Sequence, residues 1–219
     1  PYMSGLSIHA AGNRMVYAGV YGPGYMNSGG GLSRFDGEKW TWTRYSSMQL
    51  DKENFVKDIT SDAKGTVWAV CGGKLASIAD STWKFYDTSA ALILFDIGGT
   101  LWIHTGNGIS YMADGALHNI ALPDGFAPSD IVALGASAGG GILALTQYGE
   151  LLGVTTDGIV TTLAPKETES RFTAMTVDDS GTVWAGLSNG GIARFDNGVW
   201  TTYPLRESLL GIAAYRMTI

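Results

Sequence analysis

Residues 178–203 read DDSGTVWAGLSNGGIARFDNGVWTTY and hold three short apolar segments that are separated by turn sequences. Ser180-Gly181 precedes the first segment, Asn189-Gly190-Gly191 follows it, and Asn197-Gly198 precedes the third. Asn-Gly is typical of β-hairpins, because both central residues of a type I′ turn need a positive φ. The run FTAMT at 172–176 supplies a fourth β-prone segment. The stretch therefore predicts a four-stranded antiparallel meander, whose apolar face needs cover from the rest of the chain.

The motif Asp-x-x-Gly-Thr-x-Trp occurs three times in the chain. Its aspartates and tryptophans are Asp62 with Trp68, Asp96 with Trp102, and Asp178 with Trp184. Two more divergent copies place Leu143 and Tyr17 at the tryptophan position. A second, mostly aromatic frame keeps step with the first and comprises Trp40, Trp83, Leu117, Val160 and Trp200. A period of roughly 40–45 residues with four strands per unit is typical of propeller blades.

The repeats predict an all-β fold: a five-bladed β-propeller of four-stranded antiparallel blades, forming a single domain over residues 1–219. The expected blades span about 5–45, 55–87, 91–122, 131–163 and 171–204. Residues 209–219 repeat the spacing of a blade's first strand. We expect this C-terminal strand to take part in ring closure beside the N-terminal blade, since an unpaired edge strand is prone to aggregate.

The repeated Asp and Trp positions have a structural interpretation. The Asp carboxylate accepts backbone N–H groups in a turn where Gly supplies the positive φ, and Trp fills the wedge between neighbouring sheets. Calcium ligation by the aspartates is the alternative, but each turn offers about one carboxylate whereas calcium takes six to eight oxygens. We therefore expect no metal and no cofactor. Trp68, Trp102 and Trp184 should be largely buried, with Leu143 in the equivalent place of the fourth repeat.

These repeats resemble those of the two-component regulator propellers, which are periplasmic sensor modules of bacterial signalling proteins. The segment GTVWAGLSNGGIARFD at 181–196 follows the family's repeat closely, and the second and third repeats follow it well. The resemblance implies a propeller fold, a sensor-like role and a periplasmic or extracellular location. Five blades is fewer than the family usually carries, and no kinase segment is present in this sequence. Propellers host enzymes, lectins and scaffolds alike, so the fold alone does not define the function.

Composition and charge exclude several classes of partner. The chain has 14 Lys and Arg against 20 Asp and Glu, for a net charge of −6, and the cations form no run. This argues against nucleic acid and against an anionic membrane surface. No segment reaches the length of a membrane span, and the single Cys71 excludes an intramolecular disulfide. Because the sequence begins with Pro1 rather than Met, we expect a processed product or a fragment of a longer chain.

No catalytic motif is evident in the sequence. His9, His104 and His118 lack the spacing of metal ligands, and no G-x-S-x-G elbow occurs. Carboxylates from different blades could still meet at a central channel, so a propeller lyase or hydrolase is one alternative. A purely structural interaction scaffold is another. The sequence favours a non-enzymatic, sensor-like module that binds a small molecule, glycan, peptide or protein.

We expect a ligand on the side of the propeller where the loops between second and third strands meet those between successive blades. The candidate binding residues are Tyr21, Tyr25, Met26, Asn27, Asn107, Gln147, Tyr148 and Asn189. Tyrosine combines a flat apolar body with a polar tip, which suits it to a sugar or a peptide, and the amides supply hydrogen bonds. The alternative for the long loop at 20–31 is that it only covers the channel mouth or packs on a neighbour.

Overall fold

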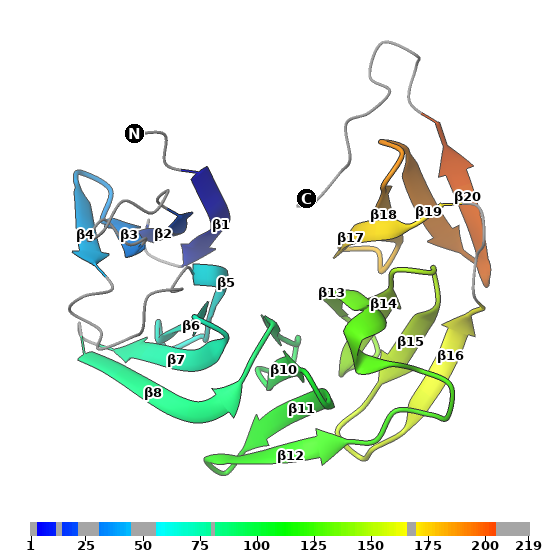
Figure 1. Cartoon of the computed structure of the whole chain (residues 1–219), viewed down its shortest axis with the longest axis horizontal. Coiled ribbons are helices and arrows are strands. Elements are labelled where there is room, and N and C mark those ends of the chain that lie inside the picture. Colours follow the sequence, from blue (N-terminus) through cyan, green and yellow to red (C-terminus); the bar gives the residue numbers. More distant parts are fainter. Residues whose placement is uncertain are drawn as a thin grey trace. The chain divides into compact units, whose positions relative to one another are not determined.

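The structure is a computed structural model that describes residues 4–11, 15–21, 31–44, 56–79, 82–165 and 170–204. These residues form five four-stranded sheets (Figure 1). Sheet 1 holds β1 (Ser4–Ala11), β2 (Met15–Tyr21), β3 (Gly31–Phe35) and β4 (Trp40–Arg44). Sheet 2 holds β5 (Val56–Ser61), β6 (Val67–Cys71), β7 (Lys74–Ala79) and β8 (Thr82–Ser89). Sheet 3 holds β9 (Leu92–Phe95), β10 (Leu101–Thr105), β11 (Gly108–Ala113) and β12 (Ala116–Ile120).

The last two sheets follow a short 3-10 helix, η2 (Pro128–Asp130). Sheet 4 holds β13 (Ile131–Ala136), β14 (Ile142–Thr146), β15 (Leu151–Val154) and β16 (Val160–Ala164). Sheet 5 holds β17 (Phe172–Val177), β18 (Val183–Leu187), β19 (Ile192–Asp196) and β20 (Val199–Tyr203). In every sheet the strands are neighbours in chain order, so the prediction of five four-stranded meanders is confirmed.

The chain divides into two compact units, and each is described by itself. The first comprises Pro1–Phe95 and Ile103–Gly106, and the second comprises Asp96–Trp102 and Asn107–Ile219. The predicted closing segment, 209–219, lies outside the described residues. Its part in ring closure, like the assignment of the whole chain to one domain with the blade limits given above, stays a prediction.

The hairpin signals act differently at the two Asn-Gly sites of sheet 5. Between β19 and β20, Asn197 has a φ of 50° and Gly198 a φ of 83°, as a type I′ turn requires. Between β18 and β19, Gly190 has a φ of 87° but Asn189 has a negative φ. There the Asn189 side chain carries the turn, because its Oδ1 accepts the backbone N–H of Gly191 at 3.0 Å.

The aspartate of each motif organises the turn between the first and second strands, as predicted. Asp62 Oδ1 accepts the backbone N–H of Thr66 at 2.8 Å, and Asp178 Oδ1 accepts that of Thr182 at 2.9 Å. The copy at Asp96 makes the same bond. The glycine before the threonine has a φ of 82° to 83° in all three copies. The motif is therefore a turn signature that fixes how the second strand begins.

The tryptophan of the motif finds its hydrogen-bond partner inside the motif. The indole N–H of Trp102 donates to Asp96 Oδ2 at 2.9 Å, and that of Trp184 donates to Asp178 Oδ2 at 3.3 Å. In each of these two copies, one carboxylate oxygen accepts the backbone N–H of the turn and the other accepts the indole N–H. Trp68 differs, because its buried indole N–H has no partner among the residues that the structure describes.

Burial of the three tryptophans is less uniform than predicted. Trp102 is fully buried, with an exposed fraction of 0%, but Trp68 and Trp184 are only half-buried. Trp68 stacks on Tyr86 at 5.3 Å between ring centroids. Trp184 lies on the last sheet that the structure describes, so no later sheet among the described residues covers its face. Leu143 is buried, as predicted for the fourth repeat.

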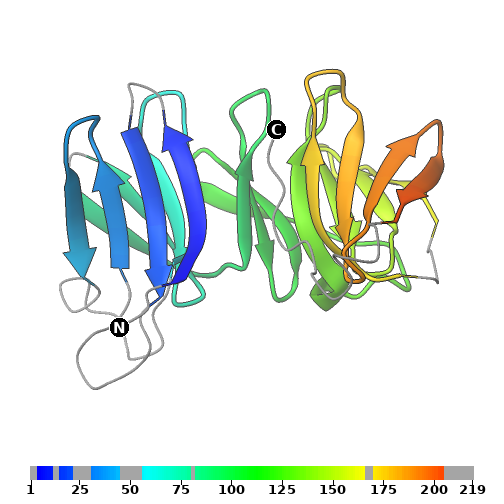
Figure 2. The same ribbon diagram turned by 90° about the horizontal axis from the view of Figure 1, so that it is seen from above.

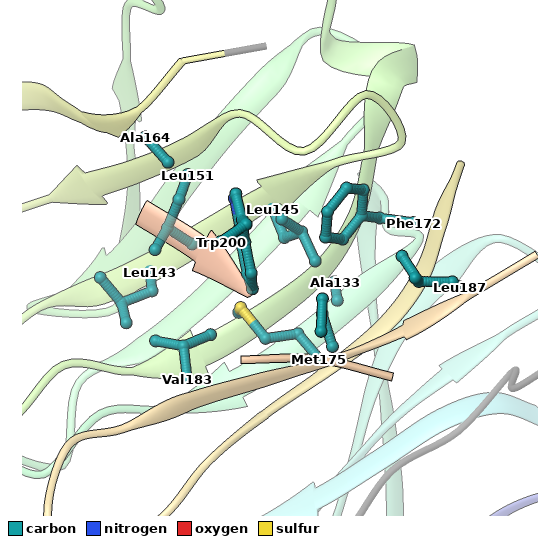
Figure 3. Close-up of a cluster of buried hydrophobic side chains, with 12 residues drawn as sticks. Ala133, Leu143, Leu145, Leu151, Ala164, Phe172, Met175, Val183, Leu187 and Trp200 are labelled. Carbon is teal, nitrogen blue, oxygen red and sulfur yellow. The ribbon is translucent and has the colours of Figure 1, made fainter. Parts of the chain in front are cut away.

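Each unit has a core between two neighbouring sheets, which lie side by side in Figure 2. In the first unit, sheets 1 and 2 bury Tyr17, Leu32, Val56, Ile59, Val67, Ala69, Cys71 and Ala76. In the second, sheets 4 and 5 bury a larger cluster (Figure 3), namely Ala133, Leu143, Leu145, Leu151, Ala164, Phe172, Met175, Val183, Ala185, Leu187, Ala193 and Trp200. These interdigitating apolar faces fix the turns at the ends of the strands relative to one another within each unit.

The buried position of Cys71 leads to a chemical prediction. Its side chain is fully buried in the core of the first unit, and burial raises the pKa of the thiol to about 12. Because the thiolate is the reactive form, the native protein should react with a water-soluble thiol reagent at least about a hundredfold more slowly than the protein in concentrated urea. Reaction at the same rate in both conditions would show that β6 opens readily in the native state.

Candidate functional site

The turns between second and third strands lie against the segments that lead into the next sheet. In the first unit the Ala90 N–H donates to Gly73 O at 2.7 Å. In the second unit the Gln147 N–H donates to Asp130 O at 2.7 Å, and Gln147 O accepts the Phe172 N–H at 2.9 Å. The two kinds of loop therefore meet on one side in each unit, as the sequence predicted.

The eight predicted binding residues have different outcomes. Tyr25, Met26 and Asn27 lie outside the described residues, and so does the side chain of Tyr21, which ends β2. Asn107 is exposed in the turn between β10 and β11. The remaining three contact one short segment, 170–171. Gln147 and Tyr148 contact Arg171, and Asn189 contacts Ser170. A binding role for the eight stays a prediction.

Arg171 is the centre of a polar network on this side of the second unit. Its Nη1 donates to Gln147 Oε1 at 2.8 Å, and Gln147 Nε2 donates to Asp130 Oδ1 at 2.7 Å. The guanidinium carbon also lies 5.8 Å from the centroid of the Tyr148 ring, within the range of a cation–π interaction. Arg171 forms no ion pair with any carboxylate in the described part of the chain. Its charge is thus exposed, held in place and not paired with a carboxylate of the described residues.

A pocket of about 330 Å³ lies at the end of sheet 5, and the residues before and after Arg171 in the chain, Ser170 and Phe172, are part of its lining. Its lining residues are Ser170, Phe172, Leu187, Asn189, Gly191, Trp200, Thr202 and Pro204. Phe172, Leu187 and Trp200 are nearly buried and form an apolar floor, and Figure 3 shows all three as members of the core cluster. Around the floor, Ser170, Asn189 and Thr202 supply polar groups and are more exposed. An apolar floor with a few polar groups around it is the usual composition of a ligand pocket.

Hydrogen bonds hold both the rim and the floor. Asn189 Nδ2 donates to Ser170 Oγ at 3.1 Å, while its Oδ1 accepts the Gly191 N–H, so both ends of this amide are in use. The Trp200 indole N–H donates to Gly149 O at 2.9 Å. This bond ties the floor of the pocket to the turn between β14 and β15, which is the turn that also holds Arg171 through Gln147.

The sequence of that shared turn explains its rigidity. Thr146 is buried, and its Oγ1 accepts the backbone N–H groups of Tyr148 at 3.3 Å and Glu150 at 3.1 Å. The same hydroxyl donates to Glu150 Oε2 at 2.9 Å. Gly149 takes the positive φ of 87° that the turn requires. Thr146 thus accepts the backbone N–H groups of its turn, as the aspartates do in the motif turns. The motif turns precede the second strand of a sheet, whereas this turn follows it.

Sequence reasoning missed Arg171 and the pocket floor. Arg171 was only the first residue of the expected fifth blade, 171–204, and Trp200 was one member of a repeat frame. A partial signal existed: Arg171 is the cation immediately before the apolar start of a first strand, and Gln147 and Tyr148 lie in a turn sequence of the preceding repeat. The pairing itself depends on which connector lies against which turn, and that is a tertiary property.

Two further observations concern other kinds of site. Within the described ranges, no group of three or more His, Cys, Asp or Glu side chains is placed to hold a metal ion. None of the helices in the part of the chain that the structure describes is long and apolar enough to cross a membrane.

Comparison with known proteins finds similarity of structure but not of sequence. No protein-family model matches the chain, and no curated protein matches it by sequence. Virginiamycin B lyase from Staphylococcus aureus matches with a TM-score of 0.73 at 18% identity, over 92% of this chain and 70% of the lyase. The extracellular domain of a hybrid two-component system, BT3049 from B. thetaiotaomicron, matches with a TM-score of 0.67 at 18% identity, over 89% of this chain and 28% of that one.

A third solved structure, YCF48 bound to D1 peptide, matches with a TM-score of 0.62 at 15% identity, over 90% of this chain and 65% of that one. Together with the five four-stranded sheets, these similarities define the chain as an all-β propeller. The resemblance to bacterial sensor propellers is met at the level of fold, since extracellular domains of two-component systems are among the similar structures. At such identities, the likeness concerns the fold alone.

Proposed function

We propose that the chain is a non-enzymatic binding module that takes a small ligand or the end of a peptide in the pocket of sheet 5. The observation that carries this proposal is the pocket itself: a nearly buried floor of Phe172, Leu187 and Trp200 beneath a rim that is already hydrogen-bonded. Such a pocket needs little rearrangement to bind, so less of the interaction energy is spent on ordering side chains.

The proteins of similar structure support a binding role without defining the ligand. One of them carries a bound peptide, and another is the extracellular domain of a two-component system. We therefore propose a sensor-like role and a periplasmic or extracellular location for this chain. A lyase is also among the similar structures, so enzymatic turnover is the main alternative, and a scaffold that binds no small ligand is the other.

A matched pair of variants on β20 tests the proposal. Thr202 lines the pocket, whereas Thr201 is its neighbour on the opposite face of the strand, and both are exposed. Thr202→Tyr should fill the pocket and Thr201→Tyr should leave it open, and tyrosine suits a strand in both places. Ligands would be identified by thermal shift from a panel of amino acids, dipeptides and mono- and disaccharides, because a ligand that binds only the native state raises its melting temperature.

We expect a stabilising ligand to lose at least about tenfold in affinity with Thr202→Tyr and to bind the Thr201→Tyr variant as it binds the wild type, a difference of about 1.4 kcal/mol or more. Equal affinity for both variants would place the binding site elsewhere. Conversion of the ligand to a product would favour the lyase or hydrolase alternative.

A further inference from the structure

We propose that the ligand is anionic: the C-terminal carboxylate of a peptide with an aliphatic last residue, bound by Arg171, with the aliphatic side chain in the adjacent pocket. This inference rests on the proposed function and adds the chemical class of the ligand. It joins the exposed guanidinium and the apolar floor, two features that the same turn holds in place.

The hydrogen bonding of Arg171 leaves most of its donors open. A guanidinium has five N–H donors, and among the described residues the Arg171 side chain donates only to Gln147 Oε1. Four N–H groups therefore point to no described acceptor. A carboxylate matches the fork of a guanidinium with two parallel hydrogen bonds, which are charge-assisted and about twice as strong as neutral ones.

Arg171 is also positioned before any ligand arrives. Asp130 Oδ1 accepts from Gln147 Nε2 and thereby turns the opposite atom of the amide, Oε1, towards Arg171. The Tyr148 ring supports the guanidinium from another side. The neutral amide separates Asp130 from Arg171, so the aspartate positions the arginine without pairing with it. A surface arginine that is mobile would lose more side-chain entropy on binding than this one.

The pocket beside Arg171 suits an aliphatic side chain better than a sugar ring. Sugar binding needs an open aromatic face, but Phe172 is 3% exposed and Trp200 is 9% exposed, so these rings offer little more than their edges. The Trp200 indole N–H is already used by Gly149 O. A volume of about 330 Å³ lies at the lower end of the range for ligand pockets, which fits a terminal residue rather than a long chain.

The segment 170–171 places the two halves of the proposed site next to each other. Ser170 lines the pocket, Arg171 follows it in the chain, and Phe172 forms part of the floor. The Arg171 carbonyl accepts the Ser188 N–H at 2.8 Å, which fixes the backbone of this segment against the turn between β18 and β19. Arg171 itself is not among the residues that line the pocket, so the proposed ligand extends from its guanidinium to the pocket mouth at Ser170.

The experiment compares N-acetyl-Gly-Leu, which carries a free carboxylate, with its C-terminal amide, which differs only in lacking that charge. A third probe, D-glucuronate, supplies a carboxylate on a sugar. Binding at millimolar concentration would be followed by ligand-observed NMR and calorimetry on the whole chain. The variants are Arg171→Gln and a control, Arg194→Gln, which removes a surface arginine that is ion-paired with Asp196.

We expect the free acid to bind the wild type at least about tenfold more tightly than the amide, as charge-assisted hydrogen bonds imply. Arg171→Gln should abolish this difference, while Arg194→Gln should preserve it. Because the attraction is partly between exposed charges, added salt should weaken binding of the acid and not of the amide.

Three results would overturn the inference: no binding of the acid to the wild type, equal binding of acid and amide, or an acid–amide difference that survives Arg171→Gln. Tighter, Arg171-dependent binding of glucuronate than of the peptide would also overturn it and assign the site to an acidic sugar. A neutral ligand that is lost with Thr202→Tyr but kept with Arg171→Gln would uphold the proposed function while rejecting this ligand class.

Discussion

Trp102→Ala is expected to lower the free energy of unfolding by about 3–5 kcal/mol, as is usual when a fully buried tryptophan is truncated. The side chain has no exposed surface, it packs on Tyr111 at 5.4 Å between ring centroids, and its indole N–H donates to Asp96 Oδ2. The substitution therefore leaves a cavity and also leaves a carboxylate oxygen of a nearly buried aspartate without its partner. For a chain of this length we expect the melting temperature to fall by roughly 10 °C.

Two further variants separate the parts of this loss in urea unfolding followed by circular dichroism. Trp102→Phe keeps most of the apolar burial but removes the N–H donor, so its loss, about 1–3 kcal/mol, reports mainly on the bond to Asp96. Trp184→Ala changes the same motif position where the side chain is only half-buried, and should cost less than Trp102→Ala. Equal losses at Trp102 and Trp184 would contradict the view that burial decides the cost.

The regular repeats could be predicted from the sequence because each of them encodes local structure. The aspartate bonds to N–H groups within four residues of itself, and the glycine supplies a φ that other residues avoid. Such interactions join residues that are close in the sequence, so a sequence motif is sufficient to predict them. The five meanders followed from the repetition of these turns, together with alternating apolar residues.

The candidate site was less predictable, because its contacts join residues that are far apart in the sequence. Arg171 meets Gln147 across 24 residues, and Trp200 meets Gly149 across 51. Both Gln147 and Tyr148 were chosen from the sequence for their hydrogen-bonding and aromatic groups, yet nothing in the sequence showed that Arg171 would use them. Burial of Trp184 was misjudged for a related reason, since it depends on whether another sheet covers the face that carries this side chain.

The fourth repeat shows how an irregular sequence can be a structural requirement. The threonine of the motif is replaced there by Gly141, and the aspartate by Ser137. The turn keeps its backbone hydrogen bonds, with Ser137 N–H donating to Gly141 O at 3.1 Å. Gly141 has a φ of 71°, which the threonines of the other copies do not adopt, and the backbone at the end of β15, at Val154 and the following Thr155, passes close to it. The divergence from the motif thus accommodates a close approach between this turn and the end of β15.

Gly141→Ala should consequently be among the most damaging single substitutions in the second unit. A Cβ added at Gly141 would overlap the carbonyl oxygen of Val154 and lie 3.2 Å from Thr155 Cα, and both are backbone atoms that cannot rotate away. The positive φ adds a further cost of about 1–2 kcal/mol for any residue with a Cβ. We expect a total loss of about 3–5 kcal/mol in the free energy of unfolding, in the range of mutations that disturb a packed backbone.

Gly140→Ala is the matched control for this prediction. Gly140 is the preceding residue and has a φ of 92°, so it carries the same kind of conformational cost, but a Cβ there meets no atom within 4 Å. Its loss should be limited to about 1–2 kcal/mol. The difference between the two variants in urea unfolding therefore measures the overlap with β15 alone. If Gly140→Ala and Gly141→Ala lost the same amount, the close approach of Val154 would not constrain this position, and the divergence of the fourth repeat would have no structural basis in this contact.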